Sequence, residues 1–183
     1  MMEEVFGQMT ADDMVRIIDR QIEKLDTVGS DDMIRLRREI EQHTGDPANW
    51  FDLGIAINQA ALQRSHLLTE RAQLLDPGVG ECDADTGSSI PLYERALEAF
   101  HKVLELEPQY YGVWCQIGTV YGNMQRYDDA ETCYRRALQE DDEDFSAAYF
   151  LGCVLRDKGD EEQARHYFAL AHDLNPDSVN CES

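Results

Sequence analysis

The second half of this chain repeats itself at a fixed interval of 34 residues. Alanine, an aromatic residue and glycine each return at this spacing. The repeated positions are Ala96, Ala130 and Ala164, then Phe100, Tyr134 and Phe168, and finally Gly118 and Gly152. An interval of this length indicates an array of helical pairs, in which each pair buries its apolar face by stacking on the next. Such arrays usually present a concave binding surface rather than a catalytic pocket.

Two complete units follow one another at residues 111–144 and 145–178. In each unit a first helix carries glycine beside large apolar residues, and a second helix carries alanines and an aromatic residue on the facing side. Small residues such as Gly118 and Ala130 let the two helices cross closely. Gly159, between the helices of the last unit, can take the positive φ that a tight turn needs.

A third unit, at residues 47–110, is split by an insertion at about residues 60–89. Trp50 and Trp114 occupy the same repeat position but lie 64 residues apart, which is one interval of 34 plus 30. The second helix of this unit is expected only at residues 91–107.

The insertion itself has two parts. Residues 60–75 are compatible with a helix that prolongs the first helix of the unit, and a break near Arg64–His66 is the alternative. Residues 76–89 are rich in Pro, Gly, Asp and Ser and are expected to form a loop.

The repeated residues resemble the tetratricopeptide repeat, whose pattern is W-x2-L-G-x2-Y followed by A-x3-F, A and P. The first-helix residues that carry the resemblance are Trp50, Leu53, Gly54 and Ile57, then Trp114, Ile117, Gly118 and Tyr121, and then Leu151, Gly152 and Leu155. The chain departs from the pattern at Val103, where Ala is usual, and at Asp142, where Pro is usual. The resemblance covers about residues 47–176 and implies an all-α, right-handed α-solenoid of three helix pairs.

The N-terminal 45 residues lack the repeat pattern. Residues 10–26 and 30–43 instead have the apolar spacing of amphipathic helices, and we expect them to form a helical hairpin that caps the first repeat. The expected organisation is a single domain with capping helices at 1–45, repeats at 47–110, 111–144 and 145–178, and a tail at 179–183.

The resemblance also implies where a partner binds, because first helices of this family line a concave groove. The positions carried over to this chain are Phe51, Ile55 and Asn58, then Cys115, Thr119 and Asn123, and then Tyr149, Cys153 and Arg156. Whether the N-terminal hairpin occludes this groove is left open. Some family members grip a terminal carboxylate with Lys, Asn and Arg, but Phe51 and Ile55 stand where the first Lys and Asn would be. The groove is therefore expected to suit an apolar or amphipathic segment.

The formal charge of −21 bears on the class of partner. A surface this negative repels nucleic acid and anionic lipid, so neither is an expected partner. The charge serves either solubility or the attraction of a basic partner.

Five cysteines without a CxxC pair indicate reduced thiols in the cytoplasm. The N-terminus shows no secretory signal, and no stretch is apolar for the roughly 20 residues that a membrane span needs. Redox activity of Cys115 and Cys153 is left open.

The sequence offers no catalytic, metal or cofactor motif. The acidic segment 83–87 has its glycine one position too early for a calcium loop, and the five histidines form no ligand pair. No nucleophile elbow, phosphate loop or dinucleotide fingerprint is present, so enzymatic activity is not expected.

The favoured function is therefore non-catalytic binding of a protein or peptide segment in the groove. The alternatives are a dedicated chaperone for a secreted or assembly-bound client and, from another class, an enzyme with a site in the insertion loop. The polar outer face of the last helix favours a monomer, with a homodimer as the alternative.

Overall fold

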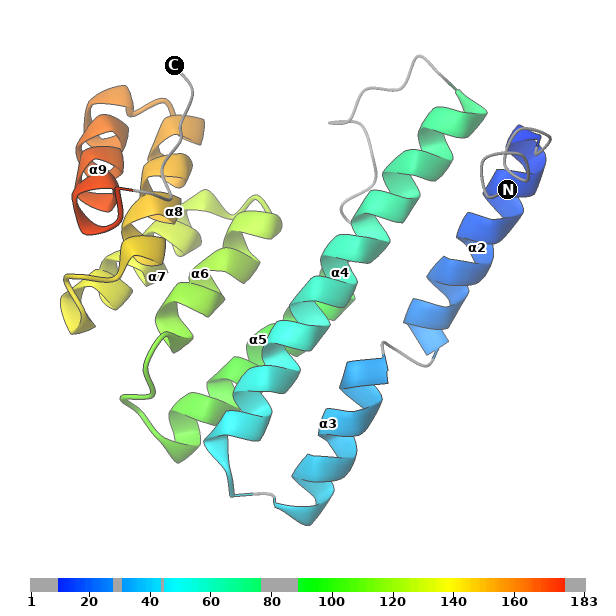
Figure 1. The fold of residues 1–183 in the computed structure, drawn as a ribbon, viewed down its shortest axis with the longest axis horizontal. Coiled ribbons are helices and arrows are strands. Elements are labelled where there is room, and N and C mark those ends of the chain that lie inside the picture. The colour runs from blue at the N-terminus through cyan, green and yellow to red at the C-terminus, as the bar shows by residue number, and fades with distance from the viewer. Residues whose placement is uncertain (1–9, 28–30, 44, 77–88, 177–183) are drawn as a thin grey trace. The chain divides into compact units, whose positions relative to one another are not determined.

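The segments with amphipathic spacing form helices throughout the part of the chain that the structure describes. The structure is a computed structural model that describes residues 10–27, 31–43, 45–76 and 89–176, and in these ranges it contains helices and no strands (Figure 1). The helices are α2 (Ala11–Thr27), α3 (Asp31–Gln42), α4 (Pro47–Leu75), α5 (Ile90–Leu106), α6 (Val113–Asn123), α7 (Tyr127–Glu140), α8 (Phe145–Asp157) and α9 (Glu161–Leu174). The all-α class predicted from the repeat is confirmed.

These helices group into two compact units, one ending at Ala96 and the other beginning at Leu97. The first unit contains α2, α3, α4 and the start of α5. The second contains the rest of α5 and the helices from α6 to α9. The expected organisation as a single domain stays a prediction.

The longest helix, α4, extends the first helix of the split repeat into the insertion. It begins after Asp46, whose side chain accepts a hydrogen bond from the backbone N–H of Ala48 at 2.9 Å, and Pro47 takes the first turn, where no helical partner is lost. The helix then runs without interruption for 29 residues to Leu75. The break considered near Arg64–His66 is absent, and the loop expected at 76–89 lies almost wholly outside the described residues.

The N-terminal helices pack against α4 one after the other along its length (Figure 1). Their apolar faces bury Ile18 and Leu25 from α2 and Met33 from α3. Two ion pairs fix α2 on the C-terminal half of α4: Arg64 to Asp26 and Arg71 to Asp19, each at 2.6 Å.

This arrangement differs from the expected capping hairpin. Helices α2 and α3 lie one after the other beside α4, and each packs mainly against α4 instead of against the other (Figure 1). The physical reason is the length of α4, which offers apolar surface to both helices in succession.

In the second unit α6 pairs with α7 and α8 pairs with α9, while α8 also packs against α7 and α6. The pairs cross closely where glycine faces an aromatic ring. A Cβ placed on Gly118 would lie 2.8 Å from the ring of Tyr134, and one on Gly152 would lie 2.8 Å from the ring of Phe168. These two contacts are 34 residues apart in the sequence, so the repeated residues make the same packing contact in each unit.

The core of the second unit is formed by the facing surfaces of these pairs. Its centre includes Leu151 at 0% exposed and Tyr134 at 2%. The turn between α8 and α9 uses Gly159 with a φ of 86°, as the sequence predicted. Asp144 and Asp160 are the N-cap residues just before α8 and α9, and the side chain of each accepts a hydrogen bond from a backbone N–H of the first turn.

Candidate functional site

Six of the nine predicted contact residues lie on two neighbouring helices of the second unit, α6 and α8. Cys115, Thr119 and Asn123 follow one another at intervals of four residues on α6 and therefore share one face of it. Tyr149, Cys153 and Arg156 do the same on α8 at intervals of four and three. The six residues are Cys115, Thr119, Asn123, Tyr149, Cys153 and Arg156.

The other three residues, Phe51, Ile55 and Asn58, lie on α4 in the first unit. Phe51 and Ile55 are half-buried, and Asn58 is only 6% exposed, so Asn58 offers little surface to a ligand. A role for these three in binding stays a prediction.

Cys115 lies in the core and not on an open surface. Its side chain is 4% exposed, and its backbone carbonyl accepts a hydrogen bond from Thr119 Oγ1 at 3.0 Å. Burial, reinforced by the negative charge of Asp144, raises the pKa of the Cys115 thiol to about 12. The thiol stays protonated at neutral pH, which opposes the reactivity that a redox role would need.

Thr119 connects α6 to the second helix of its pair. Besides donating to Cys115, it accepts a hydrogen bond from the Tyr134 hydroxyl at 3.3 Å. Burial dominates the environment of Tyr134 and raises the pKa of its phenol. Thr119 therefore helps to satisfy a buried hydroxyl, in addition to any contact it makes with a partner.

Aromatic rings gather on α8. The ring of Tyr149 lies 6.1 Å from Phe145, 5.6 Å from Phe150 and 5.8 Å from Phe168, measured between ring centroids. Phe150 remains 38% exposed although it stacks on Tyr134. We call Phe145, Tyr149 and Phe150 the α8 aromatic cluster.

Arg156 adds a cation near this cluster. Its guanidinium lies 6.0 Å from the centre of the Phe168 ring, and it pairs with Asp157 at 3.4 Å. Arg156 is exposed, so its donors can also reach a partner.

The sequence reasoning missed Phe150. One signal was available, because the residue 34 positions earlier is Gln116, so a polar position in one unit is aromatic in the next. A departure of this kind from the internal repeat marks a side chain that the packing pattern does not require.

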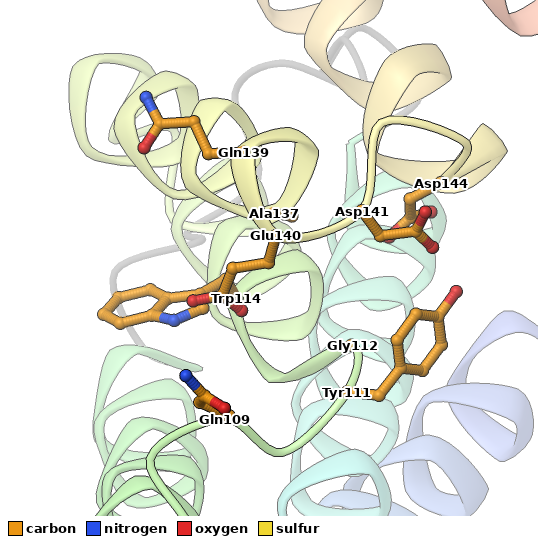
Figure 2. Close-up of a pocket in the computed structure, with 9 residues that line it drawn as sticks. All are labelled: Gln109, Tyr111, Gly112, Trp114, Ala137, Gln139, Glu140, Asp141 and Asp144. Atoms are coloured by element: carbon orange, nitrogen blue, oxygen red, sulfur yellow. The ribbon is translucent and has the colours of Figure 1, made fainter.

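A second feature that the sequence reasoning missed is a pocket of about 410 Å³ in the same unit (Figure 2). Its lining comes from the start of α6, the end of α7 and the turn before α8. The side chains that matter for its chemistry are Tyr111, Trp114, Glu140, Asp141 and Asp144. Tyr111 is 69% exposed, which is unusual for so large a ring, and this exposure is visible only in the structure.

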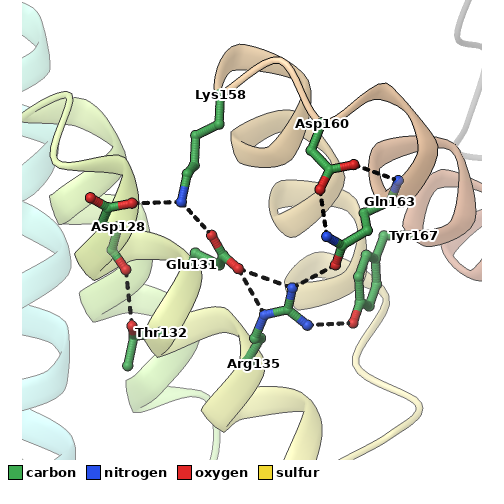
Figure 3. A network of polar contacts seen from close by, with 8 residues as sticks. All are labelled: Asp128, Glu131, Thr132, Arg135, Lys158, Asp160, Gln163 and Tyr167. Atoms are coloured by element: carbon green, nitrogen blue, oxygen red, sulfur yellow. Dashed lines mark hydrogen bonds and ion pairs between the residues drawn. The ribbon is translucent and has the colours of Figure 1, made fainter.

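A polar network holds the second unit's helices in register (Figure 3). Lys158, after α8, binds Asp128 at 2.5 Å and Glu131 at 2.6 Å on α7. Arg135 on α7 binds Glu131 on its own helix and reaches Gln163 and Tyr167 on α9. The network thereby ties α7 of one repeat to both helices of the next.

Replacing Lys158 with methionine removes its ion pairs with Asp128 and Glu131 and is expected to lower the Tm at pH 7. The decrease should be only a few degrees, because exposed ion pairs each contribute little stability. Hydrogen bonding to Lys158 lowers the pKa of Glu131, and the same two acidic partners raise the pKa of Lys158. Because the pKa of Glu131 is lowered on folding, its ion pair stabilises the folded state at pH values above the unfolded pKa near 4.5, and this stabilisation is lost as the pH falls. Because the pKa of Lys158 is raised on folding, its stabilisation is present at pH values below the unfolded pKa near 10.5.

The Tm difference between wild type and Lys158→Met should therefore be largest between about pH 5 and 9 and should decrease towards pH 3. Circular dichroism melts over this range measure it. Lys102→Met is the matched control, because Lys102 pairs only within its own helix, with Glu105. An equal effect of the two substitutions would contradict the role of the network between repeats.

The described residues contain no group of three or more His, Cys, Asp or Glu side chains arranged to hold a metal ion. The acidic segment 83–87 lies outside the described residues. Within those residues, no helix is both long enough and apolar enough to cross a bilayer.

Comparison with known proteins agrees with the repeat pattern. Residues 115–179 match the family model described as "Tetratricopeptide repeat", and this segment covers nearly all of the two complete units found from the 34-residue interval. The resemblance noted in the sequence is confirmed.

Two curated proteins are similar over about half of this chain. "Anaphase-promoting complex subunit 3" of Schizosaccharomyces pombe is 24% identical over 86 residues, which are 47% of this chain and 13% of that protein. "Protein bimA" of Emericella nidulans is 31% identical over 88 residues, which are 48% of this chain and 11% of that protein. The matched segment thus spans only a small part of each relative's length.

Among solved structures, MamA from Desulfovibrio magneticus RS-1 is 17% identical with a TM-score of 0.44, over 91% of this chain and 98% of that one. YrrB, described as "a TPR protein with an unusual peptide-binding site", is 16% identical with a TM-score of 0.44, over 86% of this chain and 84% of that one.

Proposed function

We propose that this chain, whose residues 115–179 match the tetratricopeptide repeat, binds an apolar or amphipathic segment of a protein partner, without catalysis, on the face formed by α6 and α8. The observation that carries this proposal is the α8 aromatic cluster with Arg156 beside it. Aromatic and Arg side chains are the residues that most often dominate the energy of protein interfaces.

The geometry of the cluster supports binding rather than packing alone. Tyr149 is only half-buried and Phe150 is 38% exposed, so both rings present some surface to solvent. Tyr149 is held by Phe145 and Phe168, and Phe150 is held by Tyr134 and Tyr149. These contacts fix both rings in place, which lowers the entropic cost of binding a partner. Thr119, Asn123 and Cys153 are partly exposed on the same two helices and would add polar contacts.

The partner that suits this face is a short apolar or amphipathic stretch with a basic residue. The chain's formal charge of −21 favours association with a positively charged segment. Phe51, Ile55 and Asn58 would contribute further contacts if the same partner also reaches α4.

The test is selection of random peptides displayed on phage against the full chain, followed by calorimetry with the best binders. We expect peptides enriched in apolar residues, and we expect Tyr149→Glu to weaken them by about 30-fold or more, the effect of losing a central aromatic contact. Phe51→Glu should weaken them too if α4 takes part.

The matched control is Ala169→Glu, which adds the same charge at an exposed position of α9. It should leave the affinity unchanged. Circular dichroism must show that both variants keep their helicity. Equal affinity for wild type and a folded Tyr149→Glu variant would disprove binding on this face.

A further inference from the structure

The pocket beside the start of α6 has a chemistry of its own. It is built from a turn and two helix ends of the second unit and includes none of the nine predicted contact residues (Figure 2). Figure 2 shows Tyr111 on one side with Asp141 and Asp144 beyond its hydroxyl, and Trp114 on the other side. The pocket therefore combines two aromatic rings with a carboxylate edge.

The carboxylates at this edge are not balanced by nearby cations. Glu140 pairs with Arg136 at 3.1 Å, but among the described residues neither Asp141 nor Asp144 has an ion pair. Asp141 accepts the backbone N–H of Glu143 at 3.1 Å, and Asp144 accepts that of Ala147 at 3.0 Å. Both partners are neutral backbone donors, so among the described residues no cation pairs with either carboxylate, although Asp144 also lies at the positive N-terminal end of α8.

Asp144 is the more unusual of the two, because only 9% of it is exposed. A carboxylate removed from water to this extent normally has a charged partner or a metal. Its field is felt by its neighbours, since Asp144 is the main cause that raises the pKa of the Tyr111 phenol.

A second unsatisfied group lines the same pocket. The indole Nε1 of Trp114 is buried and has no hydrogen-bond partner. Arg136 covers the Trp114 ring at 5.4 Å but provides no acceptor for this N–H. A buried donor without a partner is rare and costs stability.

We propose that this pocket binds the guanidinium group of an arginine side chain presented by a protein partner. A planar guanidinium can stack on the exposed ring of Tyr111 while its fork of N–H donors reaches Asp141 and Asp144. Arginine fits better than lysine because stacking and forked donation both require a plane.

The pocket is a contact separate from the α8 aromatic cluster, so the inference does not depend on the function proposed above. A Tyr149→Glu variant should retain arginine binding in the pocket. Loss of peptide binding at α8 and loss of arginine binding here are therefore distinguishable results.

The experiment is an NMR titration of the ¹⁵N-labelled full chain with the peptide acetyl-Gly-Ser-Arg-Ser-Gly-amide at physiological salt, which screens unspecific attraction. The chain has two tryptophans, so a Trp50→Phe variant assigns the indole signal of Trp114. We expect that signal to shift and to saturate with the arginine peptide. The lysine peptide should bind with an affinity at least fivefold weaker. The citrulline peptide, which keeps the shape without the charge, should cause none.

The decisive variant is Asp141→Asn/Asp144→Asn, in which asparagine can still begin α8. It should weaken the arginine peptide at least fivefold. The matched control is Asp142→Asn/Glu143→Gln, which removes the same charge from two exposed neighbours that do not line the pocket and should leave the affinity unchanged.

Equal weakening by both double variants, or equal shifts with the citrulline peptide, would overturn the proposal. If the Asp141→Asn/Asp144→Asn chain does not fold, Tyr111→Ala replaces it, because Tyr111 is exposed and its removal leaves the core intact. Unchanged arginine affinity in a folded Tyr111→Ala variant would likewise overturn the stacked geometry.

Discussion

Leu151→Ala is expected to lower the free energy of unfolding of the second unit by about 2–5 kcal/mol. Leu151 is 0% exposed and belongs to the core where α8 meets the helices around it. Truncation removes buried apolar area and leaves a cavity, because neighbours such as Tyr134 are held by their own contacts and collapse only in part. The loss lies within the range of total stability for a small domain, so the variant should unfold at markedly lower urea concentration.

Fluorescence makes the measurement specific for this unit. In a Trp50→Phe background the remaining tryptophan, Trp114, belongs to the second unit and reports its unfolding in urea. Leu170→Ala is the matched control, since it makes the same chemical change at a partly exposed position of α9. The control should lose clearly less stability. Equal losses in the two variants would contradict the placement of Leu151 at the centre of the core.

Gly118→Ala is expected to destabilise the second unit, although alanine is the better helix former. The added Cβ would lie 2.8 Å from the ring of Tyr134, which is itself 2% exposed and cannot move freely. Overpacking of this kind costs about 1–3 kcal/mol, whereas replacing glycine by alanine in a helix gains about 0.5–1 kcal/mol. The clash should therefore outweigh the gain.

Gly122→Ala provides the comparison within the same helix. A Cβ there meets only the Tyr134 hydroxyl at 3.9 Å, so the gain in helix propensity should appear without a clash. We expect the two variants to differ by about 1–3 kcal/mol in urea unfolding, with Gly118→Ala the less stable. Adding Tyr134→Leu should reduce that difference, because it removes the ring that the new Cβ meets. A Gly118→Ala variant as stable as Gly122→Ala would mean that the helices separate easily at this crossing.

Much of the helical architecture was predictable from local pattern. The positions of α6, α7, α8 and α9 follow from the apolar spacing within each repeat. At α8 and α9 the capping Asp residues and the turn at Gly159 also act within a few residues of the helix ends. The extension of α4 into the insertion was predictable for the same reason. The choice between a continuous and a broken α4 was not, since residues 64–66 suit either and the ion pair of Arg64 with Asp26 supports the continuous form.

The candidate binding surface was predictable only as a set of positions. The repeat register placed Thr119, Tyr149 and Arg156 on the faces of α6 and α8, but it did not show that Cys115 on the same face is buried. Exposure depends on what the neighbouring helix contributes at each position. Phe150 was missed for the same reason, because its partner Tyr134 comes from another repeat.

The sequence by itself determined that this chain is an array of helical pairs, because the 34-residue interval couples each glycine to the aromatic ring that needs its space. Only the tertiary structure decided where unsatisfied groups come together. Tyr111 and Trp114 lie 33 and 30 residues before Asp144, and no local pattern relates them to it. They meet because α7 returns the chain to the start of α6, and charge and hydrogen bonding in the resulting pocket depend on distance in space, not along the chain.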